Sequence, residues 1–340
     1  MSKILIIYTG GTIGMVESED QQTLVPFDLK HILEKVPELQ KLGAELDSVS
    51  FDQPIDSSDM MPAHWAHLAH QVEVNYDQYD GFVILHGSDT LAYTASALSF
   101  MFEGLRKPII LTGSQLPIGR IRTDARENLI TAVDFAIQKI ADEPVIQEVA
   151  VCFEDQLFRG NRTKKFSTEA FDAFISPNYP DLAAAGVNLN FDHQELYRSE
   201  KTAFRLTGGF DQRVAVLTFF PGITEQLVLS VLTNESLRGI VLMTFGAGNL
   251  PRHPWLLEAI KKAVARGLVV VNVTQCAKGN VEQGKYETSS GLAEGGVVSC
   301  GDMTLEASLT KLMFLLGQSE DADWVRDQMA TNLKGELSIR

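Results

Sequence analysis

Seven short runs of apolar, often β-branched residues recur along the chain, and each is apolar at successive rather than alternate positions. They cover residues 4–8, 82–85, 109–112, 149–153, 214–219, 240–244 and 268–274. Strands of this kind are covered on both faces, which is typical of parallel sheets between helices. The pattern therefore predicts an α/β fold.

Helical periodicity fills the segments between these runs. We expect helices over residues 63–76, 90–104, 123–141, 225–234, 254–266, 304–316 and 322–333. Between about residues 178 and 213 the sequence shows neither the helical period nor the pattern of a strand. A chain of 340 residues also exceeds the roughly 250–300 that one core serves. We predict a parallel-sheet N-terminal domain over residues 1–190 with helices on both faces, a linker over 191–212, and a smaller α/β C-terminal domain over 213–340.

The charge balance narrows the range of partners. The chain has 29 basic against 44 acidic side chains, a formal net charge of −15. Nucleic-acid binding depends on basic side chains that neutralise phosphates, so we expect no nucleic-acid partner. No segment approaches the roughly 20 consecutive apolar residues of a membrane span, so we expect no membrane association.

The first residues and the cysteines bear on the compartment. A short apolar run leads directly into a glycine-rich turn, without the longer apolar region of a signal peptide. Cys152, Cys276 and Cys300 include no close pair, which argues against a disulfide framework and a cysteine metal site. Both features favour a cytoplasmic location.

Polar, glycine-containing turns follow three of the predicted N-terminal strands. Their sequences are Thr-Gly-Gly-Thr-Ile-Gly at 9–14, His-Gly-Ser-Asp-Thr at 86–90 and Thr-Gly-Ser-Gln at 112–115. Ligands of open parallel sheets bind at the carboxyl ends of the strands. If the three strands are neighbours, we expect the hydroxyls of these turns to converge on one crevice. One such turn alone is typical of a helix cap, whereas three at one sheet edge favour catalysis.

Several familiar sites do not fit these turns. Gly11 and Gly14 have the spacing of a dinucleotide fingerprint, but Thr9 stands where its first glycine belongs. We find no P-loop and no Gly-x-Ser-x-Gly elbow. The turns instead favour a hydroxyl nucleophile such as Thr12, with backbone N–H groups for the oxyanion and a nearby base.

Three histidines at every third position of one predicted helix invite a metal-site interpretation. These residues, His64, His67 and His70, do not share one helix face, and no Glu-x-x-His partner accompanies them. We expect a solvated helix face and no metal.

Six motifs together resemble those of a known family. The motifs lie at 9–14, 56–60, 80–90, 112–117, 159–162 and 245–249. With them the chain resembles the L-asparaginases, most closely the bacterial cytoplasmic type I enzymes, nearly end to end. The resemblance implies hydrolysis of the side-chain amide of L-asparagine to L-aspartate and ammonia, with no metal or organic cofactor. It also implies a homo-oligomer built as a dimer of dimers.

The resemblance assigns roles residue by residue. Thr12 matches the nucleophile, and Asp89 matches the carboxylate that pairs with the substrate's α-ammonium group. The segment Asp56, Ser57 and Ser58 matches the one that holds the α-carboxylate.

Two further residues complete the implied machinery. Ser88 matches a second hydroxyl, and Lys165 matches the lysine of a hydroxyl–lysine–aspartate relay. The family chemistry then implies attack by Thr12, loss of ammonia, and hydrolysis of the acyl-enzyme by a water activated near Ser88 and Lys165.

The chain departs from the family pattern at several positions. Relatives usually carry Thr at position 88, and many carry a Tyr in the first loop where this chain has Leu24. In the regulatory pocket of type I relatives Cys276 is retained, but Lys164 and Met243 replace a Thr and an Arg. The resemblance therefore gives no support for effector control by asparagine.

Two alternatives stay open. One is an amidase of the same architecture that acts on glutamine or on a glutamyl-type amide for tRNA charging, although the acidic charge disfavours docking of tRNA. The other is a sensor that binds asparagine or aspartate without turnover, which the missing Tyr and Ser88 motivate.

Overall fold

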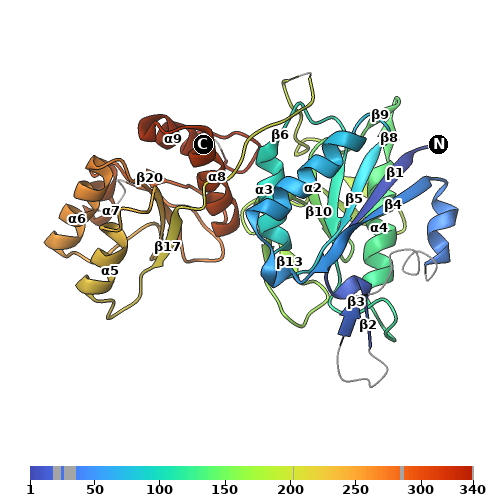
Figure 1. Ribbon diagram of the computed structural model, residues 1–340, viewed down its shortest axis with the longest axis horizontal. Coiled ribbons are helices and arrows are strands. Elements are labelled where there is room, and N and C mark those ends of the chain that lie inside the picture. Colours follow the sequence, from blue (N-terminus) through green and yellow to red (C-terminus); the bar gives the residue numbers. More distant parts are fainter. Residues whose placement is uncertain (18–23, 27–35, 202, 284–286, 339–340) are drawn as a thin grey trace. The chain divides into compact units, whose positions relative to one another are not determined.

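The computed structural model describes residues 1–17, 24–26, 36–201, 203–283 and 287–338. The chain divides into two compact units, Met1–Thr207 and Gly208–Arg340, each built around its own main sheet (Figure 1).

An eight-stranded sheet forms the centre of the first unit, in the order β15-β14-β11-β10-β7-β5-β1-β4. The strands are β1 (Lys3–Gly10), β4 (Glu45–Ile55), β5 (Gly81–Leu85), β7 (Ile109–Thr112), β10 (Val149–Phe153), β11 (Gln156–Arg159), β14 (Ala183–Ala185) and β15 (Leu189–Phe191). The five strands from β10 to β4 are parallel, as predicted. The remaining three add antiparallel ladders, so the sheet is mixed.

Helices cover both faces of this sheet, which confirms the predicted layering. Alternate strand residues such as Ile4, Ile6 and Tyr8 share a core with Leu129 and Val133 of α4 (Ala125–Ile137). The opposite face lies against α3 (Leu91–Met101), with α2 (Pro62–Asn75) packed beside it (Figure 1). β5, β7 and β10 are buried throughout, which explains their uninterrupted apolar sequences.

Three predicted helices end three or four residues earlier than their periodicity suggested. One of them, expected over 322–333, stops at Met329. The helix expected over 90–104 stops at Met101, because β6 (Phe102–Glu103) pairs with β16 (Arg205–Leu206). The helix expected over 123–141 stops at Ile137, where β8 (Lys139–Ile140) and β9 (Glu143–Pro144) form a hairpin. The β6–β16 pair also draws part of the segment 191–207, expected as linker, into the first unit.

Short elements complete the first unit. They are η1 (Thr12–Gly14), β2 (Met15–Glu17), β3 (Leu24–Pro26), η2 (Pro37–Leu42), η3 (Ser57–Asp59), η4 (Gly160–Arg162), β12 (Lys164–Lys165) and β13 (Phe174–Ile175).

The second unit is a smaller α/β domain, as predicted. Its parallel sheet has the order β17 (Val214–Thr218), β18 (Gly239–Thr244), β19 (Val269–Thr274) and β20 (Val298–Ser299). On one face α5 (Glu225–Leu232) and α6 (Pro254–Ala265) share the core. On the other face lie α8 (Leu305–Gln318) and α9 (Ala322–Met329). A further helix, α7 (Glu287–Glu294), is not predicted by the sequence pattern.

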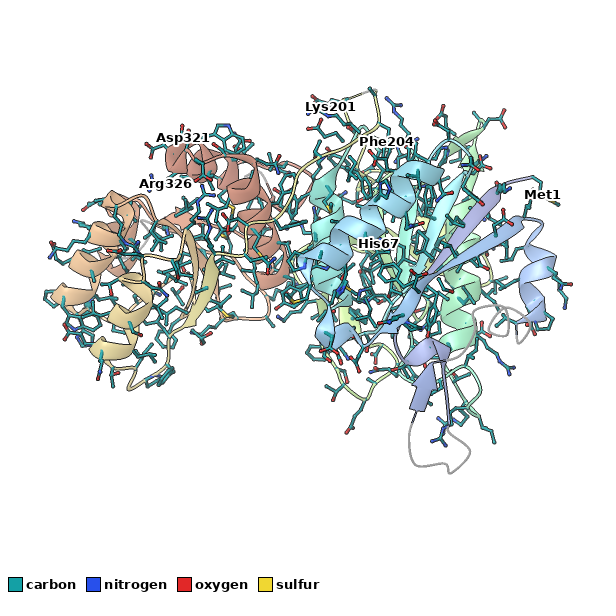
Figure 2. The ribbon with its side chains drawn as sticks, in the orientation of Figure 1. Met1, His67, Lys201, Phe204, Asp321 and Arg326 are labelled. Carbon is teal, nitrogen blue, oxygen red and sulfur yellow. The ribbon has the colours of Figure 1, made fainter. Side chains whose placement is uncertain are left out.

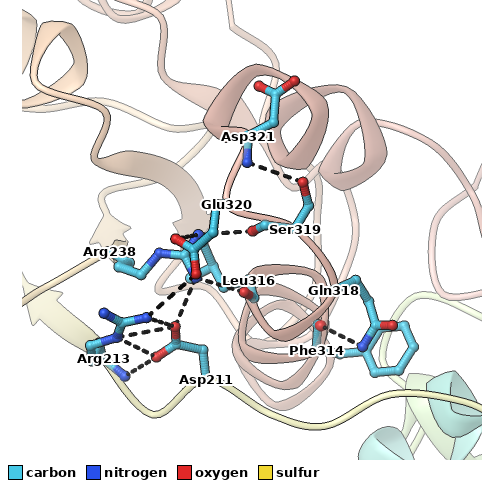
Figure 3. A network of polar contacts seen from close by, with 9 residues as sticks. All are labelled: Asp211, Arg213, Arg238, Phe314, Leu316, Gln318, Ser319, Glu320 and Asp321. Atoms are coloured by element: carbon cyan, nitrogen blue, oxygen red, sulfur yellow. Dashed lines mark hydrogen bonds and ion pairs between the residues drawn. The ribbon is translucent and has the colours of Figure 1, made fainter.

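An ion-pair cluster anchors the start of the second unit (Figure 3). Asp211 accepts hydrogen bonds from Arg213 and, at 2.9 Å, from Arg238. The Arg213 bonds hold the pKa of Asp211 well below its ordinary value. Arg238 also donates to the carbonyls of Leu316 and Ser319 at the end of α8. The cluster therefore fixes the chain before β17 to the end of α8.

A buried ion pair involves Lys311, at the middle of α8. Lys311 Nζ lies 2.6 Å from Glu336 Oε1, and both side chains are inaccessible to solvent. Lys311 also donates to the carbonyl of Met329 at 3.2 Å, while Glu336 accepts the backbone N–H groups of Leu333 and Lys334. The pair joins α8 to the end of α9 and to the segment that follows it.

The three histidines of α2 have separate structural contacts. His64 Nδ1 accepts from the Met61 N–H at 3.0 Å. His67, which is labelled in Figure 2, packs edge-on against Phe51. His70 lies 3.3 Å from Glu73. Within the part of the chain that the structure describes, no three His, Cys, Asp or Glu side chains gather as a metal site would require.

The helices were also compared with the dimensions of a lipid bilayer. None of those in the described ranges combines the length and the apolar character that crossing a membrane needs.

Candidate active site

The predicted turns meet at one edge of the eight-stranded sheet. β7, β5 and β1 are adjacent and parallel, so the turns at 112–115, 86–90 and 9–14 follow neighbouring carboxyl ends. β4 is the next strand, and its end leads into the segment 56–59. The condition that the three strands are neighbours is therefore met, and the polar segment 56–59 lies beside them.

Glycine backbones pack directly against one another where these segments meet. Gly11 has a φ of +87°, and a Cβ there would lie 2.4 Å from the Gly87 Cα. A Cβ on Gly87 would lie 2.6 Å from Ser57 Oγ. Thr12 and Ser88 directly follow the two touching glycines, so their Cα atoms are at most roughly 12 Å apart.

Replacing Gly11 by alanine should disrupt this junction. The left-handed backbone and the overlap with Gly87 together predict a loss of about 3 kcal/mol or more in the free energy of unfolding. Gly43→Ala is the matched control, because Gly43 has a φ of +68° but nothing within 4 Å of an added Cβ. The control should lose only about 1 kcal/mol. Urea denaturation measures both, and equal losses would contradict the close-packing argument.

Thr12 begins η1 and is partly exposed. The turn is closed by the Gly14 N–H, which donates to the Gly11 carbonyl at 3.2 Å. Within the described ranges, no hydrogen bond occupies the Thr12 hydroxyl. The hydroxyl is therefore not used as a helix cap and stays available for chemistry.

The segment from Asp56 to Ser58 forms a compact cap at the end of β4. Asp56 Oδ1 accepts the Ser58 backbone N–H and the Ser58 hydroxyl, both at 2.9 Å. Thr90 Oγ1 donates to the Ser57 carbonyl at 2.6 Å, which ties this segment to the 86–90 turn. Asp56 and Ser58 are exposed, whereas Ser57 is buried.

Lys165 joins the two polar residues of the 86–90 turn. Its Nζ donates to Ser88 Oγ at 2.8 Å and to Asp89 Oδ1 at 2.7 Å. The Lys165 side chain is 16% exposed and that of Asp89 is 63% exposed. These bonds bring the Lys165 amine to a hydroxyl and a carboxylate that lie 77 and 76 positions away in the sequence.

A buried hydrogen-bond chain supports this turn, and sequence reasoning did not assign it. The Trp65 indole N–H donates to Thr94 Oγ1 at 3.0 Å. Because the Gly87 carbonyl can only accept, His86 Nδ1 carries the ring proton, and Nε2 of the neutral ring accepts from the Thr94 hydroxyl at 2.9 Å. His86 Nδ1–H then donates to the Gly87 carbonyl at 2.7 Å. Burial lowers the pKa of His86 to about 4, which keeps the imidazole in the neutral form that this chain of bonds requires.

The third turn differs from the prediction that its hydroxyls converge on the crevice. Thr112 and Ser114 are fully buried. The Ser114 hydroxyl donates to the Leu116 carbonyl at 2.7 Å, so it serves to fold the turn. The side chain that does extend from this turn toward another loop is that of Gln115, which donates to the Ala170 carbonyl at 3.0 Å.

The positions that depart from the family pattern are only partly described. Residues 18–23 of the first loop lie outside the described residues, and Leu24 begins β3. Lys164 lies on β12 in the first unit, whereas Met243 and Cys276 belong to the second.

Comparisons with known proteins extend over both units. The family description "Asparaginase, N-terminal" matches residues 3–197, and "Glutaminase/Asparaginase C-terminal domain" matches residues 213–329. The chain is 43% identical to "L-asparaginase 1" of Escherichia coli (strain K12) over 98% of each chain.

Solved structures agree with these matches. The crystal structure of L-asparaginase I from Vibrio cholerae is 40% identical, covers 99% of each chain and has a TM-score of 0.88. The thermostable L-asparaginase from Thermococcus kodakarensis is 35% identical over 99% of this chain and 100% of its own, with a TM-score of 0.91. Because sequence and structure match nearly end to end, the chain belongs to the asparaginase family.

Proposed function

We propose that the protein hydrolyses the side-chain amide of L-asparagine to L-aspartate and ammonia. The observation that carries this proposal is the contact of Lys165 with both Ser88 and Asp89, in the turn packed against the Thr12 loop. Family membership and the names of the relatives support the same substrate.

The polar segments suit the charged head of an amino acid. Asp89 is the exposed carboxylate that pairs with the α-ammonium group. The family resemblance assigns the segment Asp56–Ser57–Ser58 to the α-carboxylate; in this structure the Ser58 hydroxyl and N–H donate to Asp56 Oδ1. A substrate held at both charges is oriented so that its side-chain amide reaches Thr12.

The reaction then needs a nucleophile and two proton transfers. The Thr12 oxygen attacks the amide carbon while backbone N–H groups of its turn stabilise the oxyanion. The C–N bond breaks as the nitrogen takes up the proton that the Thr12 hydroxyl lost on attack, which leaves ammonia and an aspartyl ester on Thr12. Water attacks this ester, with Ser88 and Lys165 as the proton relay, and restores the Thr12 hydroxyl. These steps use side chains, backbone N–H groups and water.

A second candidate substrate is glutamine, because the description matched by the C-terminal domain includes glutaminases as well as asparaginases.

We further propose that the protein works in the cytoplasm as a dimer of dimers. The three free cysteines agree with a reducing compartment.

Steady-state ammonia release from L-asparagine and L-glutamine tests the function. The proposal predicts a higher kcat/KM for asparagine. A glutamine preference would favour the second candidate, and asparagine binding without product would indicate a sensor.

The rate of ammonia release is expected to depend hyperbolically on asparagine concentration, because Lys164 and Met243 replace the family's effector contacts.

A further inference from the structure

Lys165 lies on a short strand whose own backbone pairing gives it little stability. This two-residue strand, β12, pairs among the described residues only with the equally short β13. In the hairpin 164–175 the Phe166 N–H donates to the Ala173 carbonyl at 2.7 Å. The Phe166 side chain is 67% exposed, and the tip around residues 168–169 is also exposed. Isolated two-stranded hairpins are marginally stable, so this one depends on contacts with the rest of the unit. The buried Ala173 and Phe174 anchor its second strand, and Phe174 packs against Phe153, whereas the tip needs a tie of its own.

Gln115 provides such a tie at the tip of the hairpin. Its Nε2 donates to the Ala170 carbonyl at 3.0 Å and approaches the Ser167 carbonyl at 3.5 Å. A primary amide carries two N–H donors, which matches two carbonyls. The Ser167 hydroxyl accepts the N–H groups of Glu169 and Ala170, so both carbonyls belong to one compact turn.

The backbone of the turn that carries Gln115 is itself held by buried hydrogen bonds. The buried Asp124 carboxylate accepts the backbone N–H of Gln115 at 2.8 Å and that of Leu116 at 3.0 Å. Asn128, on α4, donates to the Gly113 carbonyl at 2.9 Å. The turn at 112–115 is therefore fixed to the start of α4, and the Gln115 side chain bridges from it to the hairpin.

We propose that Gln115 is a positioning residue for Lys165. Through the hairpin it holds the Lys165 amine between Ser88 and Asp89, at the distances given above. The proposal rests on the proposed function, in which Lys165 relays a proton. Because misplacement by about 1 Å can cost about 10²-fold in rate, loss of this tie should lower kcat rather than weaken substrate binding.

The test compares Gln115→Met with Gln138→Met. Methionine keeps the length of the side chain and removes its N–H donors. Gln138 is a matched control, because its Nε2 also donates to a backbone carbonyl, that of Asp134 at 3.1 Å, away from the turns of the candidate site. Gln115→Met should lower kcat for asparagine about 10-fold with KM changed less than threefold, whereas Gln138→Met should change neither. Unchanged kcat in Gln115→Met would overturn the proposal.

A double-mutant cycle with Lys165→Met separates positioning from general structural support. If Gln115 acts through Lys165, adding Gln115→Met to Lys165→Met should change kcat by less than twofold. Independent effects that multiply would overturn the proposal.

Hydrogen exchange of the segment 164–175 gives a readout that does not depend on turnover. It should speed up in Gln115→Met and not in Gln138→Met, and unchanged exchange would overturn the proposal. If the wild-type protein fails to hydrolyse asparagine, the proposed function fails, while the exchange result still decides whether Gln115 holds the hairpin.

Discussion

Thr12→Ala is expected to lower kcat for L-asparagine by on the order of 10³-fold or more, because it removes the oxygen that forms the ester. The fold should survive. The Thr12 hydroxyl makes no hydrogen bond within the described ranges, and the turn is closed by the backbone of Gly11 and Gly14. Ammonia release measures the rate, and circular dichroism with urea denaturation checks the fold.

Thr12→Ser is the matched control for this loss. Serine keeps the hydroxyl but lacks the methyl group that restricts its rotamer, so a decrease of about 10-fold is expected. If alanine and serine behave alike at position 12, or if Thr12→Ala turns over at the wild-type rate, Thr12 is not the nucleophile.

Lys311→Met is expected to reduce the free energy of unfolding by about 3–5 kcal/mol, because it leaves the buried Glu336 carboxylate without its cation. The double variant Lys311→Met/Glu336→Gln should recover part of this loss, since no buried charge then remains. Urea denaturation followed by tryptophan fluorescence measures the change, with Trp255 and Trp324 reporting on the second unit.

An exposed ion pair of the same unit provides the comparison. Lys262 and Glu258 lie 3.6 Å apart on the surface of α6, with side chains 75% and 62% exposed. Lys262→Met should change the free energy of unfolding by no more than about 0.5 kcal/mol, because water already solvates both charges. If Lys311→Met lost as little free energy of unfolding as Lys262→Met, the claim that burial makes the Lys311–Glu336 pair costly to break would be contradicted.

The parts of the fold that the sequence predicts are those with two-sided burial. β5, β7, β10 and β19 are buried at every position, so their apolar runs are unmistakable. β4 was missed because it lies at the edge of the sheet and alternates polar with apolar residues. The antiparallel strands β11, β14 and β15 are three or four residues long, and their pairing depends on tertiary contacts that no periodicity records.

The candidate site, like the fold, has parts that the sequence predicts and parts that it does not. Strand ends followed by glycine and hydroxyl residues indicated the turns at 9–14 and 86–90 without any relative. Lys165 followed only from the family resemblance, because a two-residue strand carries no pattern. The third turn was misinterpreted for its hydroxyls, which are buried. The buried chain from Trp65 through Thr94 to His86 joins residues far apart in sequence, and no local signal reports it.

The central claim is that Thr12 carries the aspartyl group during turnover. It is tested most directly by mass mapping of peptides from enzyme quenched in acid during the hydrolysis of L-asparagine. The account predicts an aspartyl ester on the peptide that contains Thr12, absent from Thr12→Ala. An ester on another residue, such as Ser88, would contradict it.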